Sequence, residues 1–437
     1  MTEQARQSSF FSGVLSESYL RDGDRLQKRL EIPGRSVLTE RQTPVITSDP
    51  RGDWLRGFLA GTPVTVRGEP SPSVRSVELF CGPGGLALGF GEACRELGSS
   101  FESEAAVDPD AGAVAVYAAN HGTKIRSTQS ASEIVDYQIK GRGDGAEFYY
   151  EPEMIGDEWS GLVGNVDAVL AGPPCQGHSN LNNHTRRVDG RNELYLTVPA
   201  VAVALEADIV VIENVTAVVH DSSQVVATTR TLLRRADYEV TEGVFSAPDM
   251  GWPQTRKRYF LIARRSKAPI SIQDVSAALR DEVVRGVLWA IEDLEKVPFD
   301  NRLHIATTMS EENERRVQYL FDNDIYNLPN GERPDCHKEG TTYGAMYGRM
   351  YPDRPAPTIT TGFMTPGRGR YVHPTQRRVM TPWEAARIQG FPDTYNFFAD
   401  PKSPPTKQKL AKWIGDAVPS PLGYAAGISA LGNGFSR

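Results

Sequence analysis

The chain has 437 residues, a formal net charge of −7 and an ordinary share of apolar residues, so it is long enough for two or three domains with a sizeable core. No apolar run reaches the roughly 18 residues of a membrane-spanning helix, and the polar residues 1–9 lack the apolar core of a signal peptide. The negative charge argues against a nucleic-acid binder that is basic over its whole surface, although local basic patches stay open.

The cysteines indicate a reducing, cytoplasmic setting. Four cysteines in so long a chain do not form the pattern of a disulfide framework. Cys336 and His337 are adjacent, but no second pair follows at the spacing of metal ligands, so we expect no metal site.

Residues 1–72 carry the weakest pattern, with scattered Pro, Gly, Ser and Arg and short apolar clusters such as Trp54–Leu59. Two interpretations stay open. We favour a partly ordered extension that packs on the domain that follows, and the alternative is an arm that contacts DNA or another partner. Gly68–Pro72 predicts a linker at its end.

A glycine-rich turn follows a β-rich run that ends at Phe80. Gly82, Gly84 and Gly85 precede a helical pattern, and glycine allows both a tight turn and the close approach of a ligand to the backbone. About 25 residues later a second strand ends in Asp108, where a carboxylate can accept hydrogen bonds from ribose hydroxyls. Together these features predict an adenosine-type cofactor rather than a dinucleotide.

Cys175 follows another buried strand, the apolar run Val166–Leu170. Gly172–Pro174 cannot continue a strand ladder, because proline lacks the N–H and fixes φ. Cys175 is therefore expected on a stiff turn at the carboxyl end of a strand, where open α/β sheets place their chemistry. The alternative is a small buried hydrophobic residue, but the rigid flanks favour a functional one.

Further strands and helices alternate after a polar loop over residues 180–191. We expect a helix over residues 193–206, a buried strand that ends in Glu213 and Asn214, and another helix over 224–235. Arg256 and Arg258 then enter a strand, and strand alternation points them to the same side. The repeated order predicts an α/β fold with a doubly wound, mainly parallel sheet.

The composition changes after Lys267. Helical stretches over Ile272–Leu294 and Ser310–Phe321 give way to a Pro-, Gly- and Tyr-rich region. Between Thr341 and Met380 the chain has six arginines and one acid, Asp353. A solvated face is the plain interpretation, but this excess of basic residues better suits a surface that follows phosphates.

Cys175, Glu213 and Arg258 together suit attack by a thiolate on an electron-poor ring. Carbon 5 of cytosine is a poor nucleophile, and addition of a thiolate to carbon 6 makes it enamine-like. A carboxylic acid at ring nitrogen 3 would offset the developing charge, and a guanidinium at the ring oxygen would hold the base.

These residues closely resemble the motifs of the DNA (cytosine-5)-methyltransferase family, over about Val74 to Leu431. Six motifs occur in the family's order: Phe80–Gly85, Gly172–Gly177, Glu213–Val215, Gln254–Arg258, Arg377–Pro392 and Ile414–Pro419. The resemblance implies S-adenosylmethionine as methyl donor and a cytosine flipped out of double-stranded DNA, since the reacting edge is stacked in the duplex. It also implies that the region from about Lys267 to His373 reads the target sequence and that the 180–191 loop closes over the DNA.

The resemblance implies three sets of site residues. The catalytic set is Pro174, Cys175, Glu213, Arg256 and Arg258. The cofactor-binding set is Phe80, Gly82, Gly84, Gly85, Leu86, Asp108, Pro173, Leu194, Asn214 and Asp416. The DNA-binding set is Gln176, Ser179, Arg186, Arg187, Arg349, Arg368 and Arg370.

The sequence departs from the family's pattern at three places. His178 stands where the family commonly has Phe, and the acid that usually contacts the adenine is absent from Ser127–Ser130. Asp416 stands where the family usually has Asn. We favour a capping role for Asp416 at the following helix, and the alternative is a carboxylate that favours the cationic donor.

We therefore predict an extension (1–72), a catalytic and cofactor-binding domain (73–266), a target-recognition domain (267–403) and a segment that returns to the catalytic domain (404–437). A monomer is expected, and an accompanying restriction endonuclease that acts separately stays open. The alternatives are methylation of RNA cytosine and a DNA-binding regulator without catalysis.

Overall fold

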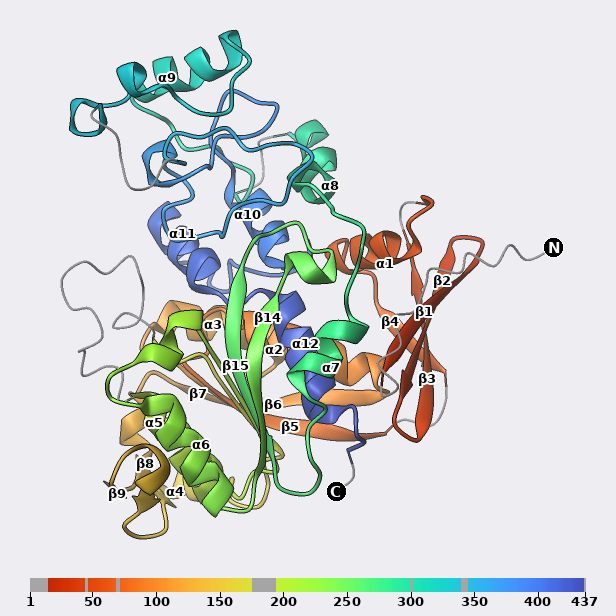
Figure 1. The fold of residues 1–437 in the computed structure, drawn as a ribbon, viewed down its shortest axis with the longest axis vertical. Helices are drawn as coiled ribbons and strands as arrows, with labels where there is room; N and C mark the ends of the chain where they lie inside the picture. Colours follow the sequence, from red (N-terminus) through yellow and green to blue (C-terminus); the bar gives the residue numbers. More distant parts are fainter. Residues whose placement is uncertain are drawn as a thin grey trace.

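The protein is described from a computed structural model, which covers residues 15–43, 46–67, 71–174, 194–298, 302–338 and 345–435. Within these residues the largest element is a seven-stranded sheet (Figure 1). Its strands are, in spatial order, β14 (Glu239–Ser246), β15 (Lys257–Arg264), β13 (Ile209–Asn214), β12 (Ala168–Ala171), β5 (Ser71–Leu79), β6 (Ser99–Val107) and β7 (Ile125–Ser127). Only β15 runs antiparallel to its neighbours, so the predicted mainly parallel sheet is confirmed.

Helices cover both faces of this sheet. In β12, Ala168 and Leu170 face one apolar cluster, whereas Val169 and Ala171 face another, as strand alternation requires. The first face carries α2 (Gly85–Glu96), α7 (Ile272–Ala278) and α12 (Ser420–Leu431). The second carries α5 (Leu194–Ala204) and α6 (Val225–Arg235), and α3 (Ala111–His121) packs against β6 and β7.

The C-terminal helix α12 packs closely on α2, the helix that follows the glycine-rich turn. A Cβ added at Gly85 would lie 2.3 Å from the Val418 carbonyl oxygen, and one at Gly89 would lie 2.0 Å from that of Ser420. Only glycine permits this approach. The end of the chain is thereby fixed beside the start of the cofactor motif.

Residues 15–43 and 46–67 form a module, which we call the N-terminal module. Its sheet has the order β1 (Ser16–Asp22), β2 (Arg25–Ile32), β3 (Arg35–Gln42) and β4 (Val64–Arg67), with α1 (Pro50–Leu59) packed beside it (Figure 1). Two-residue turns at Gly23–Asp24 and Pro33–Gly34 join the first three strands. These residues pack on the catalytic part, as the favoured interpretation expected, but their regular strands and helix were not predicted. The predicted linker already begins β5 at Ser71.

A second region, the described part of residues 287–416, lies on the opposite side of the first sheet from α4 (Asp157–Ser160) (Figure 1). It contains α8 (Val287–Ile291), α9 (Glu311–Asp322), α10 (Pro382–Gln389) and α11 (Lys407–Asp416), with turns between them. The single helix expected over Ile272–Leu294 is wrong, because α7 and α8 are separated by an irregular connector, residues 279–286. The domain division stays a prediction. Two helices pack outside their predicted domains: α7, predicted in the target-recognition domain, packs on the large sheet, and α11, predicted in the returning segment, packs on α10.

Residues 135–160, between β7 and β12, contain short elements only. β8 (Val135–Asp136) pairs with β11 (Glu153–Met154), β9 (Ile139–Lys140) pairs with β10 (Glu147–Phe148), and α4 (Asp157–Ser160) follows. Across the described ranges, no helix is both long and apolar enough to cross a membrane.

Candidate active site

A cavity of about 500 Å³ opens at the carboxyl ends of β5, β6, β12 and β13, and we call it the central cavity. This volume suits a small-molecule ligand. The cavity is lined by all of the predicted catalytic and cofactor-binding residues that the structure describes except Gly84: Phe80, Gly82, Gly85, Leu86, Asp108, Pro173, Pro174, Leu194, Glu213, Asn214, Arg256, Arg258 and Asp416. Residues from five of the six motifs therefore meet in one place, whereas no described residue of the Arg377–Pro392 motif lines the cavity.

Five predicted residues, namely Cys175, Gln176, Ser179, Arg186 and Arg187, lie outside the described residues, together with His178. Their predicted roles stay predictions. Pro174, the residue before Cys175, lines the central cavity.

The glycine-rich turn has a left-handed backbone at three positions. Phe80 has φ 55°, Gly82 has φ 51° and Gly84 has φ 94°. Glycine adopts such angles freely, whereas a residue such as Phe80 holds them at a cost of roughly 1–3 kcal/mol that the surrounding structure must offset. A strained residue at the edge of a cavity is typical of a functional site.

Asp108 braces this turn from the end of β6. Its Oδ2 accepts a hydrogen bond from the Gly82 N–H at 3.0 Å, and its Oδ1 accepts one from the Asp110 N–H at 2.9 Å. Burial raises the pKa of Asp108 above its ordinary value. Each carboxylate oxygen keeps a further lone pair with which it can accept a hydroxyl donor in the cavity.

Two side chains that the sequence analysis missed hold the other side of the turn. The Tyr395 hydroxyl donates to the Pro83 carbonyl oxygen, and His121 Nε2 lies 3.2 Å from that of Gly84. A Cβ at Gly84 would lie 2.6 Å from His121 Nε2, so glycine is required there. Burial lowers the pKa of His121 to about 4, so the ring is neutral at pH 7 and can donate to the carbonyl.

Glu78 was also missed, although an acid within the apolar strand β5 was a visible signal. The residue is 2% exposed, lines the central cavity and lies three residues before Cys81 in sequence. Burial raises its pKa to about 8, so its carboxyl is largely protonated at neutral pH.

Glu213 and Arg258 form the charged pair of the cavity. Arg258 Nε lies 2.8 Å from Glu213 Oε1, and Glu213 is 7% exposed. Burial raises the pKa of Glu213, and the nearby Arg258 and Arg256 guanidinium groups only partly oppose this shift. A carboxyl with a raised pKa is suited to donate a proton near neutral pH.

Asn214 fixes the turn that precedes Cys175. Its Nδ2 donates to the Pro173 carbonyl oxygen at 3.2 Å, and its Oδ1 accepts from the Val215 N–H at 2.8 Å. A Cβ at Gly172 would lie 3.7 Å from Glu213 Oε2. The Gly-Pro-Pro turn is therefore held directly beside the acid of the charged pair.

Arg256 ties the cavity to two distant segments. Its Nη1 donates to the carbonyl oxygens of Ile359 at 2.8 Å and Gly415 at 3.2 Å, and the residue is 3% exposed. These contacts describe a positioning role, and a direct catalytic role for Arg256 stays a prediction.

The capping role favoured for Asp416 is wrong. Asp416 is the last residue of α11, and α12 begins after Pro419 without a side-chain cap. Its Oδ2 instead pairs with Lys412 Nζ at 2.8 Å, one turn earlier in α11, because residues four apart share a helix face. The carboxylate still lines the central cavity, so the electrostatic alternative stays open.

The three recognition arginines differ in their surroundings. Arg349 Nε donates to the Pro374 carbonyl oxygen at 2.8 Å, and its guanidinium lies 4.1 Å from the Phe321 ring centre. Arg370 Nη1 donates to the carbonyl oxygens of Tyr326 and Arg349. Arg368 is exposed. Arg349 and Arg370 thus hold the second region together, and their contacts with DNA stay predictions.

Known proteins resemble this chain over nearly its whole length. A family model described as C-5 cytosine-specific DNA methylase matches residues 74–429. The type II methyltransferase M1.BsuMI of Bacillus subtilis (strain 168) is 38% identical over 421 residues, which are 95% of each chain. The type II methylase M.HgiDII of Herpetosiphon aurantiacus is 29% identical over 79% of this chain and 92% of its own.

A solved structure shares the fold. The crystal structure of an E. coli prophage-encoded DNA modification methyltransferase has a TM-score of 0.53 and 22% identity, and the match covers 81% of this chain and 98% of that one. The family match contains all six motifs, and described residues of five of them line the central cavity. The chain therefore belongs to the C-5 cytosine-specific DNA methylase family, and it methylates carbon 5 of cytosine in DNA.

Proposed function

We propose that the central cavity holds S-adenosylmethionine at the glycine-rich turn and a flipped-out cytosine at the Glu213–Arg258 pair. A Cβ built on Gly82 would meet no atom within 4 Å, so the bare backbone there leaves room for a ligand. Asp108 would accept the ribose hydroxyls with its remaining lone pairs. When bound, S-adenosylmethionine supplies the methyl group.

The observation that carries the proposed mechanism is the buried Glu213–Arg258 pair beside the Gly-Pro-Pro turn. We propose that the Cys175 thiolate forms a bond to carbon 6 of the cytosine while Glu213 donates its proton to ring nitrogen 3. The ring electron pair then makes carbon 5 nucleophilic, and carbon 5 takes up the methyl group, with S-adenosylhomocysteine as the leaving group. A base then removes the carbon 5 proton, the thiolate leaves carbon 6, and the proton on ring nitrogen 3 returns to Glu213, which restores the aromatic ring.

Arg258 has two tasks in this mechanism. Its Nε orients Glu213, and the rest of its guanidinium can donate to the oxygen of the base. One Nη1 proton is engaged by the Lys257 carbonyl oxygen at 2.9 Å, which fixes the plane of the group. A fixed guanidinium stabilises developing charge without reorganisation.

A covalent trap tests the mechanism. DNA that carries 5-fluorocytosine at the target should become covalently attached to the protein, since fluorine cannot leave carbon 5 as a proton does. The complex should survive denaturing electrophoresis and depend on S-adenosylmethionine. Methylation of ordinary DNA without any trapped complex on the fluorinated duplex would contradict a Cys175 adduct.

We also propose that the protein acts as a monomer. The type II designation of the two relatives supports a place in a restriction-modification system, in which a separate endonuclease cleaves the unmethylated sequence. The large second region and the family match favour DNA over RNA as substrate.

Asp416→Asn tests the electrostatic role. Removal of the carboxylate is expected to weaken binding of the cationic S-adenosylmethionine a few-fold more than binding of the neutral S-adenosylhomocysteine. Lys412→Gln, which removes the partner of Asp416, should shift the preference the opposite way. Calorimetric titration measures both ligands, and an unchanged affinity ratio in Asp416→Asn would rule the role out.

Arg368→Ala tests the recognition surface. The exposed Arg368 is expected to contact a phosphate, so its loss should weaken binding to every DNA sequence and lower the salt slope of log K by about one unit. Arg349→Ala should instead lower thermal stability, because it removes the contacts with Pro374 and Phe321. Binding titrations across a range of salt concentrations distinguish the two, and wild-type behaviour of Arg368→Ala would place the surface elsewhere.

A further inference from the structure

The N-terminal module contacts both the catalytic sheet and the connector that leads to the second region. The connector, residues 279–286, runs from α7 past the module to α8 (Figure 1). At its far end α8 packs against α10. The position of the connector therefore affects how the second region sits over the central cavity.

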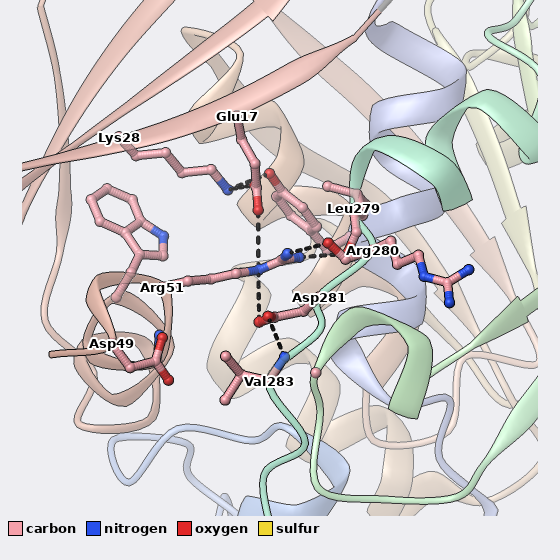
Figure 2. Close-up of polar contacts among 12 residues, drawn as sticks. Glu17, Lys28, Asp49, Arg51, Leu279, Arg280, Asp281 and Val283 are labelled. Carbon is pink, nitrogen blue, oxygen red and sulfur yellow. Dashed lines mark hydrogen bonds and ion pairs between the residues drawn. The ribbon is translucent and has the colours of Figure 1, made fainter. Parts of the chain in front are cut away.

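Arg51, in the first turn of α1, holds the backbone of the connector. Its Nη2 donates to the Leu279 carbonyl oxygen at 2.6 Å and its Nη1 to that of Arg280 at 3.0 Å. Its Nε lies 3.0 Å from Glu17 Oε1 and 3.6 Å from Asp281 Oδ2. Figure 2 shows this guanidinium between the two carboxylates, with the connector carbonyls on one side. One planar group thus joins β1, α1 and the connector.

Asp49, the N-cap residue of α1, holds the other end of the connector. Arg285 Nη2 lies 2.8 Å from Asp49 Oδ1 and 2.7 Å from Oδ2. The same arginine donates through Nη1 to Asp281 and to the Gly251 carbonyl oxygen, which follows β14. The arginine side chain is 2% exposed, so this pair is largely desolvated.

The module is itself anchored to the catalytic part through Lys28. Lys28 Nζ lies 2.9 Å from Glu17 Oε2, 2.8 Å from Glu96 Oε2 and 2.9 Å from the Tyr424 hydroxyl oxygen. Glu96 ends α2 and Tyr424 belongs to α12, the two helices that meet at the cofactor motif. Although burial opposes it, Arg51 and Lys28 hold the pKa of Glu17 below its ordinary value, so the cluster is charged at neutral pH.

The far end of α1 contacts the second region directly. The Asp393 N–H, in the loop after α10, donates to the Leu59 carbonyl oxygen at 2.8 Å. A Cβ at Gly61 would lie 2.5 Å from Thr394. Both ends of one short helix therefore contact segments of the recognition side, while β2 contacts the cofactor side.

We propose that the N-terminal module is a clamp that positions the second region for DNA, with Arg51 and Asp49 as its positioning residues. None of the described residues of the module lines the central cavity. We expect the module to act through the connector. Loss of the clamp contacts should therefore weaken the productive binding of DNA as substrate, whereas binding of the small-molecule ligand in the absence of DNA should stay unchanged.

Asp49→Asn and Arg51→Lys test the clamp with little risk to folding. Asn caps α1 about as well as Asp but loses the charge that pairs with Arg285. Lys keeps the charge beside Glu17 but cannot span two carbonyl oxygens as the guanidinium does. Each variant is expected to raise KM for DNA roughly five- to tenfold, as couplings between sites commonly do, with cofactor affinity unchanged. The substrate is genomic DNA from a host without cytosine methylation.

Asp53→Asn is the matched control. Asp53 lies in the same helix, is 1% exposed and pairs with Arg21 and Thr47 inside the module, without contact with the connector in the described structure. It should lower the melting temperature and leave KM for DNA at the wild-type value. A rise in KM as large as that of Asp49→Asn, or unchanged KM in both Asp49→Asn and Arg51→Lys, would overturn the proposal and leave the module a stabilising element only.

Discussion

Replacing Cys175 with serine is expected to abolish methyl transfer while leaving the fold and DNA binding intact. A serine alkoxide is far harder to generate than a thiolate at neutral pH, so the bond to carbon 6 would not form. The test is incorporation of labelled methyl groups into DNA, with binding measured on the same preparation. Cys336→Ser makes the same change outside the six motifs and should keep wild-type activity.

Residual methylation in Cys175→Ser at a rate comparable to the wild type would contradict the thiolate mechanism. A variant that loses activity and also loses DNA binding would show that the residue supports the structure of the site instead. Cys81 and Cys94 are not alternative nucleophiles, because both are buried and burial raises the pKa of each thiol.

Glu213→Gln should lower the rate of the chemical step by roughly 10²–10⁴-fold, the range for a positioned acid or base. Gln fits the space and can accept from Arg258, but it has no proton to give to ring nitrogen 3. Cofactor affinity without DNA should barely change. Single-turnover kinetics isolate the chemical step, and the exposed Glu239 provides the control Glu239→Gln.

The pH dependence of the same step gives an independent test of Glu213. Its pKa is raised by burial, and the protonated form is the active one, so the rate should fall as pH rises through that pKa. This descending limb should disappear in Glu213→Gln. A limb that persists in the variant would assign the titration to another group.

The arrangement of the catalytic half of the molecule could be predicted from the glycines and prolines that follow its strands. Gly and Pro end β5 and β12 at defined residues, and the carboxyl ends of parallel strands meet at one edge of a sheet. That geometry brought Phe80, Pro173 and Glu213 into one cavity. The capping expectation for Asp416 failed because the end of α11 depends on how α11 packs beside α10, which no local pattern encodes.

The strands of the N-terminal module were missed because charged residues occupy some of their inward-facing positions, which obscures the alternation of apolar and polar residues in the sequence. In β2, Leu26, Lys28, Leu30 and Ile32 all face inward, and Lys28 is 4% exposed. A buried lysine is stable there only because Glu17 and Glu96 lie against it, and neither partner is close in sequence. The connector lies within the stretch that was predicted as helical. Asp281 and Arg285, four residues apart, do pair with each other, but they also pair with Arg51 and Asp49, which are distant in sequence.

The contacts of the recognition arginines could not be predicted from the sequence either. The arginine-rich stretch predicts a phosphate surface, yet Arg349 and Arg370 are directed at backbone carbonyls and aromatic rings of the second region. An arginine that packs on tyrosine and one that binds phosphate look alike in sequence.

The most direct test of the account is to express the protein in a bacterium without cytosine methylation and to map 5-methylcytosine across the genome. The account predicts 5-methylcytosine at the same cytosine of one short DNA sequence throughout the genome, and none in cells that carry Cys175→Ser. A genome without 5-methylcytosine despite folded protein, or methylation that persists in the variant, would contradict it.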